Sequence, residues 1–278
     1  MALATFKGGI HPPDKKDIAK DRAIKEAKSP QRVVIPLSQH LGAPCKPIVS
    51  IGQEVKKGEV IGEPRGFVSA PVHSSVSGKV IAIAEFPNAM GRMINSIVIE
   101  NDGKEEWTSL KDNPDYIKLS PDELKEKVRA AGIVGMGGAA FPTLVKLSPP
   151  REKPIDTVIL NGAECEPYLT ADYRLMIERS AEIVEGLKIL MRILGVNKGF
   201  IGIENNKPDA IDKMKAAAKN EPNIEVCGLE VKYPQGAEKM LISALTGREV
   251  PPRGLPMDVR VVVQNVGTAF AVYEAARY

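Results

Sequence analysis

The chain has 278 residues, of which 43% are hydrophobic and 26% charged, a composition that excludes wholesale disorder and allows one large or two ordinary domains. Its 38 Lys and Arg residues against 35 Asp and Glu leave a net charge of +3, which is too balanced to indicate a nucleic-acid partner. No stretch has the ~18 consecutive apolar residues of a membrane span, and the first residues lack the apolar segment of a signal peptide. We therefore expect a cytoplasmic chain without a direct membrane span.

The cysteines and histidines predict no metal site. Cys45, Cys165 and Cys227 lie far apart and form no CxxC pair, and the three histidines are equally isolated. Three scattered thiols suit a reducing compartment.

Changes in composition divide the chain into three predicted parts. Residues 1–31 form an N-terminal extension, whose basic stretch between Lys15 and Arg32 we interpret as a solvated segment. Residues 32–113 consist of short β-rich runs broken by Gly and Pro, which predicts an all-β domain. A polar, turn-rich boundary leads to residues 114–278, where strand and helix patterns alternate.

Two similar phrases mark the kind of all-β domain. They read VSIGQEVKKGEVIG (49–62) and APVHSSVSGKVIAI (70–83), and each joins two strands through a polar turn closed by glycine. They resemble the two halves of the barrel-sandwich hybrid of biotinyl and lipoyl carrier domains. Carriers place a modified lysine at a hairpin tip between the halves, whereas Lys79 lies in the second half. We therefore predict a scaffold or docking module instead of a carrier.

A helix and a glycine-rich loop open the third part. Ser120, Pro121 and Glu123 predict a capped helix start, because the serine caps, the proline suits the first turn and the glutamate reaches back. This helix is expected to end at Gly132, where the sequence GIVGMGGAAFPTLVKL (132–147) begins.

The glycine-rich loop has two interpretations. Gly135, Gly137 and Ala140 fit the G-x-G-x-x-G/A dinucleotide fingerprint, but that motif requires a preceding strand, and here a helix precedes it. What remains is an anion-binding site, in which bare backbone N–H groups near a short helix at 142–147 act together with Lys146. The alternative is a tight turn between helices without a ligand.

Beyond this loop the chain is predicted to form a mostly parallel α/β sheet. Expected strands lie at 157–160, 200–203, 224–231 and 259–263, and expected helices at 173–194, 208–219, 237–246 and from 269 onward. Runs such as TVIL and VRVVV are apolar on both faces, which is typical of strands covered by helices on both sides. Ligands bind such sheets at the carboxyl ends of the strands.

An acidic loop follows the first of these strands. Glu164, Cys165 and Glu166 stand where an open α/β sheet presents its ligand site, and no basic residue accompanies them within the loop. We favour a functional role for the two carboxylates. The alternative is a solvated loop with a helix N-terminal charge preference, which predicts acids nearer residue 171.

Two further turns are predicted to reach the same edge. Gln264 and Asn265 end the last strand, and their amides can hydrogen-bond a polar heterocycle or a phosphate. Tyr233, Gly236 and Glu238 lie in the turn between the third strand and its following helix.

Several phrases together carry a specific resemblance. GMGGAAFPTLVKL, NGAECEPYLTADYRLM, KYPQGAEKML and QNVGTAFAVYEA resemble, in this order, the flavin-binding domain of the C subunit of the Rnf electron transport complex, an ion-translocating ferredoxin:NAD oxidoreductase. They are more distantly similar to the NADH-oxidising flavoprotein subunit of respiratory complex I. Because FKGGIHPPDKK and the barrel-sandwich region match as well, the resemblance covers essentially the whole chain.

The resemblance implies non-covalently bound FMN that takes a hydride from NADH and passes electrons singly to iron–sulfur clusters. It implies no catalytic side chain, since the flavin does the chemistry and the protein supplies position and electrostatics. The cofactor-binding residues that it implies are Gly135, Gly137, Gly138, Phe141, Lys146, Asn161, Glu164, Glu166, Tyr233, Gly236, Glu238, Gln264 and Asn265.

The chain departs from the family pattern in several places. Met136 stands where the complex I relatives have an Arg, and Pro149 replaces the aromatic partner of Phe141 in an adenine sandwich. Glu238 stands alone where those relatives have two adjacent acids. The family continues into a β-rich domain and a cysteine-rich module, so we expect a fragment whose 4Fe–4S clusters belong to the missing C-terminal part, since a cluster takes four cysteines.

Three functions are compatible with the residues. The first is an electron-transfer subunit, peripheral on the cytoplasmic side of the cell membrane, that passes electrons between NAD(H), FMN and iron–sulfur clusters, with ferredoxin reached indirectly through partner subunits of an ion-translocating complex. The second is a soluble corrinoid reductase of the same architecture. The third is a docking or assembly module without a cofactor, which Met136 and Pro149 favour.

Overall fold

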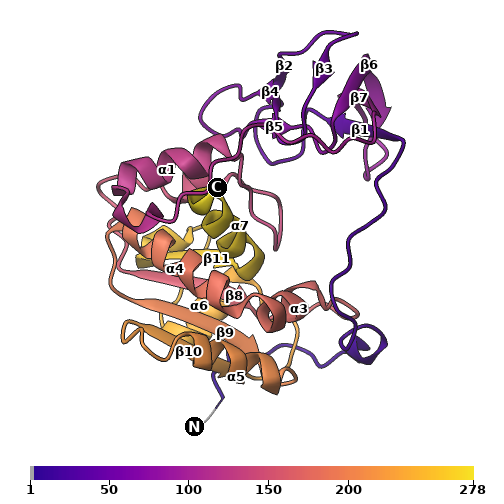
Figure 1. Cartoon of the computed structure of the whole chain (residues 1–278). Helices are drawn as coiled ribbons and strands as arrows, with labels where there is room; N and C mark the ends of the chain where they lie inside the picture. Colours follow the sequence, from indigo (N-terminus) through magenta and orange to yellow (C-terminus); the bar gives the residue numbers. More distant parts are fainter. Residues whose placement is uncertain (1–2) are drawn as a thin grey trace. The chain divides into compact units, whose positions relative to one another are not determined.

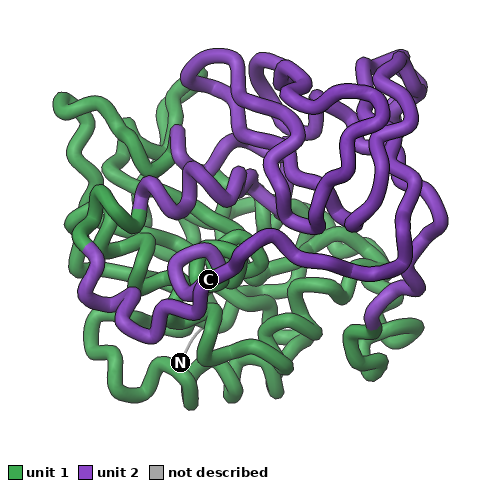
Figure 2. The backbone as a smooth tube through the Cα atoms, turned by 45° about the horizontal axis from the view of Figure 1, so that its top comes forward, with its two compact units in different colours: residues 1–25, 120–124, 146–274 green, residues 26–119, 125–145, 275–278 purple. Residues whose placement is uncertain are grey.

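The computed structural model describes residues 3–278 and divides into two compact units, which Figure 2 shows in different colours. Unit 1 comprises the described part of Met1–Lys25 together with Ser120–Leu124 and Lys146–Glu274. Unit 2 comprises Glu26–Leu119, Lys125–Val145 and Ala275–Tyr278. The boundaries at residues 32 and 114 remain predictions.

Unit 2 contains two small antiparallel sheets (Figure 1). The first has the order β1-β7-β6-β3 and the second the order β2-β4-β5. Their strands are β1 (Arg32–Pro36), β2 (Lys46–Pro47), β3 (Glu54–Val55), β4 (Val60–Glu63), β5 (Val72–His73), β6 (Gly78–Pro87) and β7 (Met93–Asn101). This is the architecture that the two repeated phrases predict for a barrel-sandwich hybrid.

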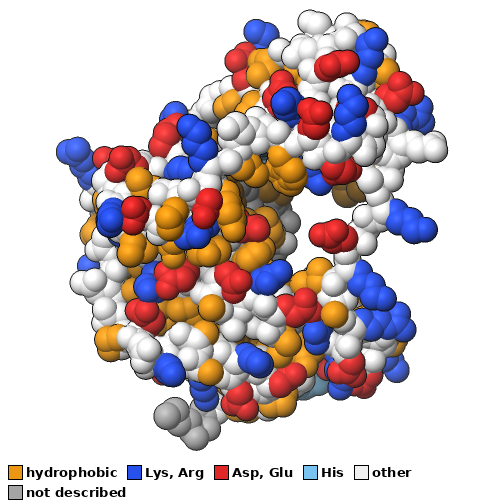
Figure 3. Space-filling view, viewed as in Figure 1, with side chains coloured by type: hydrophobic (Ala, Val, Ile, Leu, Met, Phe, Trp, Pro, Cys, Tyr) orange, Lys and Arg blue, Asp and Glu red, His pale blue; other side chains and the backbone are white. Residues whose placement is uncertain are grey.

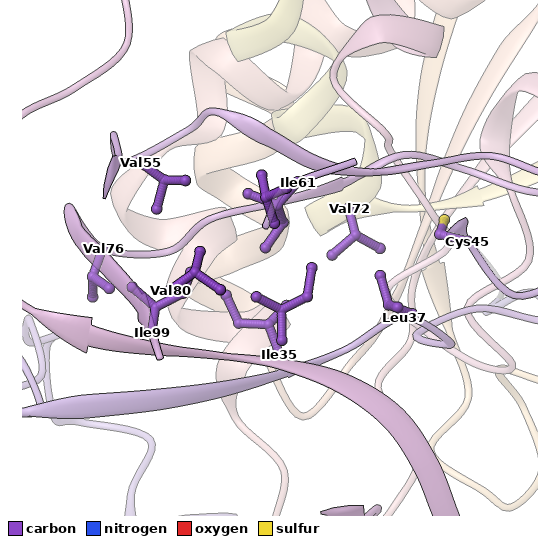
Figure 4. Packing of buried hydrophobic residues seen from close by; sticks show 11 residues of the cluster. Ile35, Leu37, Cys45, Val55, Ile61, Val72, Val76, Val80 and Ile99 are labelled. Atoms are coloured by element: carbon purple, nitrogen blue, oxygen red, sulfur yellow. The ribbon is translucent and has the colours of Figure 1, made fainter. Parts of the chain in front are cut away.

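The core of unit 2 consists of aliphatic side chains contributed by both sheets. Figure 4 shows Ile35, Val80 and Ile99 of the first sheet pointing toward Ile61 and Val72 of the second. Burying each such side chain contributes about 1.5–3 kcal/mol, so this cluster is the main stabilising feature of the unit.

Lys79 lies within a strand of this unit and not at a hairpin tip. It belongs to β6, where it pairs in register with Glu54 of β3 and Glu100 of β7. A lysine near the start of a strand and paired with a neighbouring strand on each side differs in placement from the modified lysine of a carrier domain.

Unit 1 contains a four-stranded, fully parallel sheet of order β10-β9-β8-β11. The strands are β8 (Thr157–Gly162), β9 (Gly199–Glu204), β10 (Ile224–Leu229) and β11 (Val261–Asn265). The accompanying helices are α3 (Ala171–Glu178), α4 (Ser180–Leu194), α5 (Pro208–Ala217), α6 (Glu238–Thr246) and α7 (Val266–Arg277), with short 3-10 turns η1 (Lys16–Ile18) and η3 (Pro256–Val259). The predicted parallel α/β sheet is confirmed, and its strands end together at one edge.

Two predicted helices differ from the observed ones. The segment expected as one helix, 173–194, is interrupted at Arg179, whose backbone (φ −136°, ψ 34°) is not helical. The last helix, expected from residue 269, begins at Val266 directly after β11. Its early start has a local cause, because the side-chain oxygen of Asn265 accepts a hydrogen bond from the N–H of Gly267 at 2.7 Å and caps the helix.

Helix α1 (Pro121–Ala130) begins as predicted. The N–H of Ser120 donates to the Glu123 carboxylate at 2.7 Å, and the N–H of Glu123 donates to the Ser120 hydroxyl at 3.2 Å, which forms a reciprocal capping box. Gly132 follows the helix with φ +64°, a left-handed conformation that favours glycine. The remaining short elements are η2 (Tyr116–Lys118) and α2 (Thr143–Lys146).

The N-terminal extension follows the edge of the parallel sheet. The N–H of Ala4 donates to the carbonyl of Gly228, and the N–H of Glu230 donates to the carbonyl of Ala4, both at 3.0 Å. The ammonium of Lys232 donates to the Phe6 carbonyl and lies 4.3 Å from the centre of the Phe6 ring. These contacts attach the start of the chain to β10.

The prediction that the basic stretch from Lys15 to Arg32 is solvated is wrong for Lys16. Residues 21–32 are exposed, but Lys16 is buried, with 5% of its surface accessible. The sequence does not show this burial because the groups that contact Lys16 lie about 150 residues further along the chain.

The visible surface carries mixed charges. Figure 3 shows basic and acidic side chains interspersed over this face. Within residues 3–278, no helix combines the length and the apolar character that crossing a bilayer requires.

Gly186 is expected to be essential for the packing of α4 against the start of α7. A Cβ atom at this position would lie 1.9 Å from the carbonyl oxygen of Ala269. Replacing Gly186 with Ala should therefore destabilise the protein by about 1–3 kcal/mol and lower the melting temperature by several degrees, despite the better helix propensity of alanine. Thermal unfolding followed by circular dichroism measures this effect.

Gly138→Ala is the matched control, because a Cβ there meets no atom within 4 Å. Equal melting temperatures for the two variants would contradict the close packing of α4 and α7.

Candidate functional site

Two strand ends bring predicted site residues side by side at the carboxyl edge of the unit 1 sheet. In the parallel register of β11 and β8, Asn265 pairs with Asn161 and Gln264 with Leu160. Gln264 and Asn265 are buried, and Asn161 is half-buried. The edge therefore presents amide side chains from two neighbouring strands.

The turn after β10 is hydrogen-bonded to this edge. The side-chain N–H of Asn161 donates to the carbonyl of Gly236 at 2.8 Å, and the N–H of Gly236 donates to the Cys165 sulfur at 3.3 Å. A Cβ on Gly236 would lie 3.3 Å from that sulfur, so little space remains for a larger residue. The predicted residue Tyr233 lies in the same turn, partly exposed and joined to Pro234 by a cis peptide bond.

The two carboxylates of the acidic loop have different surroundings. Glu164 is buried, and its carboxylate accepts hydrogen bonds from the N–H groups of Asp172 at 2.8 Å and Tyr173 at 3.3 Å. It thus caps α3 from seven residues before the helix, although the sequence suggested that a capping acid would lie nearer residue 171. Glu166 is exposed.

The buried position of Glu164 affects its ionisation. Burial raises the pKa of the Glu164 carboxyl, and the hydrogen bond from the N–H of Asp172 and the charges of Lys16 and Lys207 oppose that rise. A helix-capping role, related to the alternative that we had considered less favoured than ligand binding, therefore accounts for Glu164.

Asp172 is an acidic residue at this edge that the sequence analysis missed. Its carboxylate accepts a hydrogen bond from the side-chain N–H of Asn265 at 2.7 Å. Burial, followed by the nearby charge of Glu164, raises the pKa of Asp172 from 3.8 to about 6. The only sequence signal is its place in the first turn of α3, where acids are common.

A buried ion pair supports the loops that follow β8 and β9. The ammonium of Lys207 lies 3.4 Å from the Glu204 carboxylate and donates to the carbonyl of Ala163 at 2.7 Å and to the side-chain oxygen of Asn206 at 2.9 Å. Both charged side chains are almost fully buried. Burial lowers the pKa of Lys207 and raises that of Glu204, and their mutual attraction opposes both shifts.

Lys146 is engaged, whereas the sequence predicted a cation available to a phosphate. Its ammonium donates to the Glu238 carboxylate at 2.8 Å and to the carbonyl of Val263 at 3.0 Å. Both side chains remain about one-third exposed. The structure thus pairs two predicted site residues, Lys146 and Glu238, with each other, and Lys146 also binds the middle of β11.

Two buried amides near the edge lack partners. Both polar atoms of the Gln235 side chain and the side-chain nitrogen of Gln264 are buried without a hydrogen bond among the described residues. Native proteins rarely leave such groups unsatisfied, and a bound polar ligand is one way to satisfy them. This observation fits a cofactor with several donor and acceptor atoms, such as FMN. Gln235 was not predicted because a glutamine in a polar turn has no sequence feature that marks it as buried or ligand-binding.

The glycine-rich loop belongs to unit 2 and is closed by backbone pairing. The N–H of Gly135 donates to the carbonyl of Phe141 at 2.9 Å, and the N–H of Thr143 donates to the carbonyl of Ile133 at 3.0 Å. The predicted helix at 142–147 is only four residues long, α2.

The glycines within this loop have no conformational need to be glycine. Gly135 and Gly138 lie outside the left-handed region that favours glycine, and a Cβ on Gly138 would meet open space. Gly137 and Gly138 are exposed, and Phe141 is half-buried. The approach of another molecule to this loop stays a prediction, beside the alternative of a turn without a ligand.

Metal binding has no support in the geometry. Across residues 3–278, no group of three or more His, Cys, Asp or Glu side chains is arranged to hold a metal ion.

Comparison with known proteins identifies the class to which this arrangement belongs. Residues 128–274 match the family model of the Nuo51 FMN-binding domain, and residues 4–104 match that of the RnfC barrel sandwich hybrid domain. Since the first match covers more than half of the chain, the chain belongs to the Nuo51 FMN-binding domain family.

Particular relatives combine both domains. The chain is 53% identical over 274 residues to the C subunit of a proton-translocating ferredoxin:NAD(+) oxidoreductase complex from Clostridium ljungdahlii, a match covering 98% of this chain and 60% of that protein. It is 53% identical over 272 residues to the C subunit of a Na(+)-translocating complex from Acetobacterium woodii, covering 98% and 61%. The predicted resemblance to the C subunit of the Rnf complex is confirmed, and the chain spans about three-fifths of the length of these curated relatives.

A solved structure has a related fold. An NAD+-reducing NiFe hydrogenase in the air-oxidized state superimposes with a TM-score of 0.51 at 26% identity, covering 59% of this chain and 31% of that one.

Asp172 is expected to make stability depend on pH. Because its folded-state pKa of about 6 exceeds the ordinary value of 3.8, the folded state binds the proton more tightly, and stability is lost as the pH rises from about 4 through 6. Asp172→Asn removes this penalty and can still accept the hydrogen bond from Asn265. At pH 7.5 the variant should be more stable than the parent by on the order of 1–2 kcal/mol, and near pH 4 equally stable.

Urea unfolding at both pH values measures the difference. Asp122→Asn is the matched control, since Asp122 is an exposed acid in the first turn of α1. A parent chain at least as stable as Asp172→Asn at pH 7.5 would contradict the assignment.

Proposed function

We propose that this chain binds FMN at the carboxyl edge of the unit 1 sheet and forms the flavin-binding part of an electron-transfer subunit that exchanges electrons with NAD(H). Membership of the Nuo51 FMN-binding domain family supports the cofactor. The location of the FMN site is inferred from the side-chain amides of Gln235 and Gln264, which have buried polar atoms without a hydrogen-bond partner. FMN, when bound, accepts a hydride and releases electrons one at a time.

The side chains of the edge divide into two roles in this proposal. Gln235 and Gln264 offer free hydrogen-bonding atoms and would hold polar groups of the cofactor. Asn161 and Asn265 already have partners and keep the edge in place. The exposed Glu166 would bring negative charge beside the cofactor and bias its reduction potential.

The proposal extends to the predicted residues outside this edge. Gly135, Gly137, Gly138 and Phe141 of unit 2 are proposed as further cofactor-binding residues, because Gly137 and Gly138 are exposed and Phe141 is half-buried. Lys146 would assist a phosphate only together with Glu238, because its ammonium is already paired with that carboxylate.

The wider context is proposed from the names of the relatives. Those relatives are subunits of ion-translocating ferredoxin:NAD(+) oxidoreductase complexes. We infer that this chain works as a peripheral subunit on the cytoplasmic side of the cell membrane and meets other subunits of such a complex. Iron–sulfur clusters that lead toward ferredoxin would belong to polypeptide outside these 278 residues.

Titration of the purified chain into FMN, followed by flavin fluorescence, tests the site. Gln264→Leu removes an amide whose nitrogen is buried without a partner, so the unliganded variant should be at least as stable as the parent. Its FMN affinity should be about fivefold weaker, since one hydrogen bond contributes roughly 1 kcal/mol. Loss of binding without loss of stability distinguishes a ligand-binding residue from a structural one.

Gln53→Leu, an exposed glutamine of unit 2, is the control and should bind FMN like the parent. Equal affinity in Gln264→Leu would contradict the location of the site. Absence of saturable binding to the parent chain would contradict the FMN proposal and favour the docking-module interpretation.

A further inference from the structure

The acidic loop between β8 and α3 adopts an unfavourable backbone conformation. Two of its non-glycine residues have positive φ angles, Glu164 at 49° and Tyr168 at 69°. Tyr168 is also 61% exposed, so its own side chain does little to hold it there. A bulky residue persists in this region only when the surrounding structure holds it in place.

Lys16 contacts this loop from about 150 residues earlier in the sequence. Its ammonium donates hydrogen bonds to the carbonyls of Glu164 at 2.8 Å, Glu166 at 3.1 Å and Leu169 at 2.7 Å. An ammonium has three N–H donors, so all of them are used on main-chain carbonyls of one loop. Lys16 therefore holds the backbone of the loop in place through three hydrogen bonds, whereas an ordinary lysine pairs with a carboxylate. We call this arrangement the Lys16 clamp.

A second contact from the same segment holds the loop beside Lys16. The N–H of Tyr168 donates to the carbonyl of Asp14 at 2.7 Å, and the carboxylate of Asp14 accepts from the side-chain N–H of Asn206 at 2.9 Å. Residues 14–16 thus bind the loop at the strained residue and on both sides of it.

The charge of Lys16 adds to this effect. It lies close enough to the buried carboxylates Glu164 and Glu204 to oppose the rise that burial causes in their pKa values. Since Glu164 caps α3, the clamp also supports the start of that helix.

Only a lysine suits this arrangement. The three carbonyls converge on one nitrogen, which a compact ammonium with rotatable donors satisfies. A planar guanidinium spreads its donors in a fixed fork and does not match three converging acceptors.

We propose that Lys16 is a positioning residue for the proposed flavin site: it holds the backbone of the acidic loop so that Cys165 and Glu166 are presented at the carboxyl edge of the sheet. This inference rests on the proposed function for its effect on the cofactor. Lys16 and the acidic loop both belong to unit 1.

Hydrogen exchange of the full chain, followed by mass spectrometry, tests the clamp without any cofactor. Lys16→Met should raise the exchange rate of peptides covering 163–170 at least tenfold and leave those of β1 and β7 unchanged. Lys16→Arg should give an intermediate increase. Lys15→Met, which removes the same charge from the adjacent exposed residue, should have no effect. Unchanged exchange in folded Lys16→Met would overturn the clamp.

FMN titration of the same variants tests the positioning role. Lys16→Met should weaken binding about tenfold, and Lys15→Met should not. The double variant Lys16→Met/Tyr168→Gly should recover much of the lost affinity, because glycine adopts the positive φ angle without help. The positioning role would be overturned if Lys16→Met bound FMN as tightly as the parent although its loop exchanged faster. It would also be overturned if the double variant recovered no FMN affinity.

The two experiments distinguish a failure of the proposed FMN site from a failure of the Lys16 clamp. If the parent chain binds no FMN, the proposed function fails and with it the positioning role, while hydrogen exchange still decides whether Lys16 holds the loop.

Discussion

The arrangement of the sheet edge depends on the buried ammonium of Lys207. Its side chain has no accessible surface, and it binds the carbonyl of Ala163, the carboxylate of Glu204 and the side-chain oxygen of Asn206. A buried charge is tolerated only when its partners satisfy it, and removing one partner of such a pair typically costs about 3–5 kcal/mol. Because Ala163 follows β8 and Glu204 ends β9, this one group sets the relative positions of two strand ends and of the loops that leave them.

From this anchor, polar contacts continue across the edge to its last strand. Glu164 follows Ala163 and caps α3, Asp172 in the first turn of α3 accepts from Asn265, and Asn265 caps α7. Nearly every polar group in this chain of contacts is used by the protein itself. The amides of Gln235 and Gln264 are exceptions. This contrast between satisfied and unsatisfied groups separates the scaffold of the edge from the atoms left for a ligand, and residue type alone does not make that distinction.

The sequence predicted features whose causes are local. Apolar runs predicted the four parallel strands, and Ser120 with Glu123 predicted the start of α1 within one turn. It did not predict Lys16, whose partners lie about 150 residues away, or the capping by Glu164, which acts from seven residues before the helix. Both depend on where the folded chain brings distant groups together. Asn265 could have been predicted as a helix cap, because an asparagine directly before a helix is a recognisable capping residue. We had assigned it only to ligand binding.

The attachment of the first residues to β10 affects how the chain emerges during synthesis. The side chain of Thr5 donates to the carboxylate of Glu230, which lies 225 positions later, and neighbouring backbone bonds connect the same segments. A ribosome adds residues at about 5–20 per second, so the N-terminal segment waits roughly 10–45 s before its binding partner exists. During that interval the strands of the barrel-sandwich unit are already complete, because they end at Asn101. The contact between residues 4–6 and the end of β10 therefore joins two segments that are synthesised far apart in time, before β11 completes the sheet.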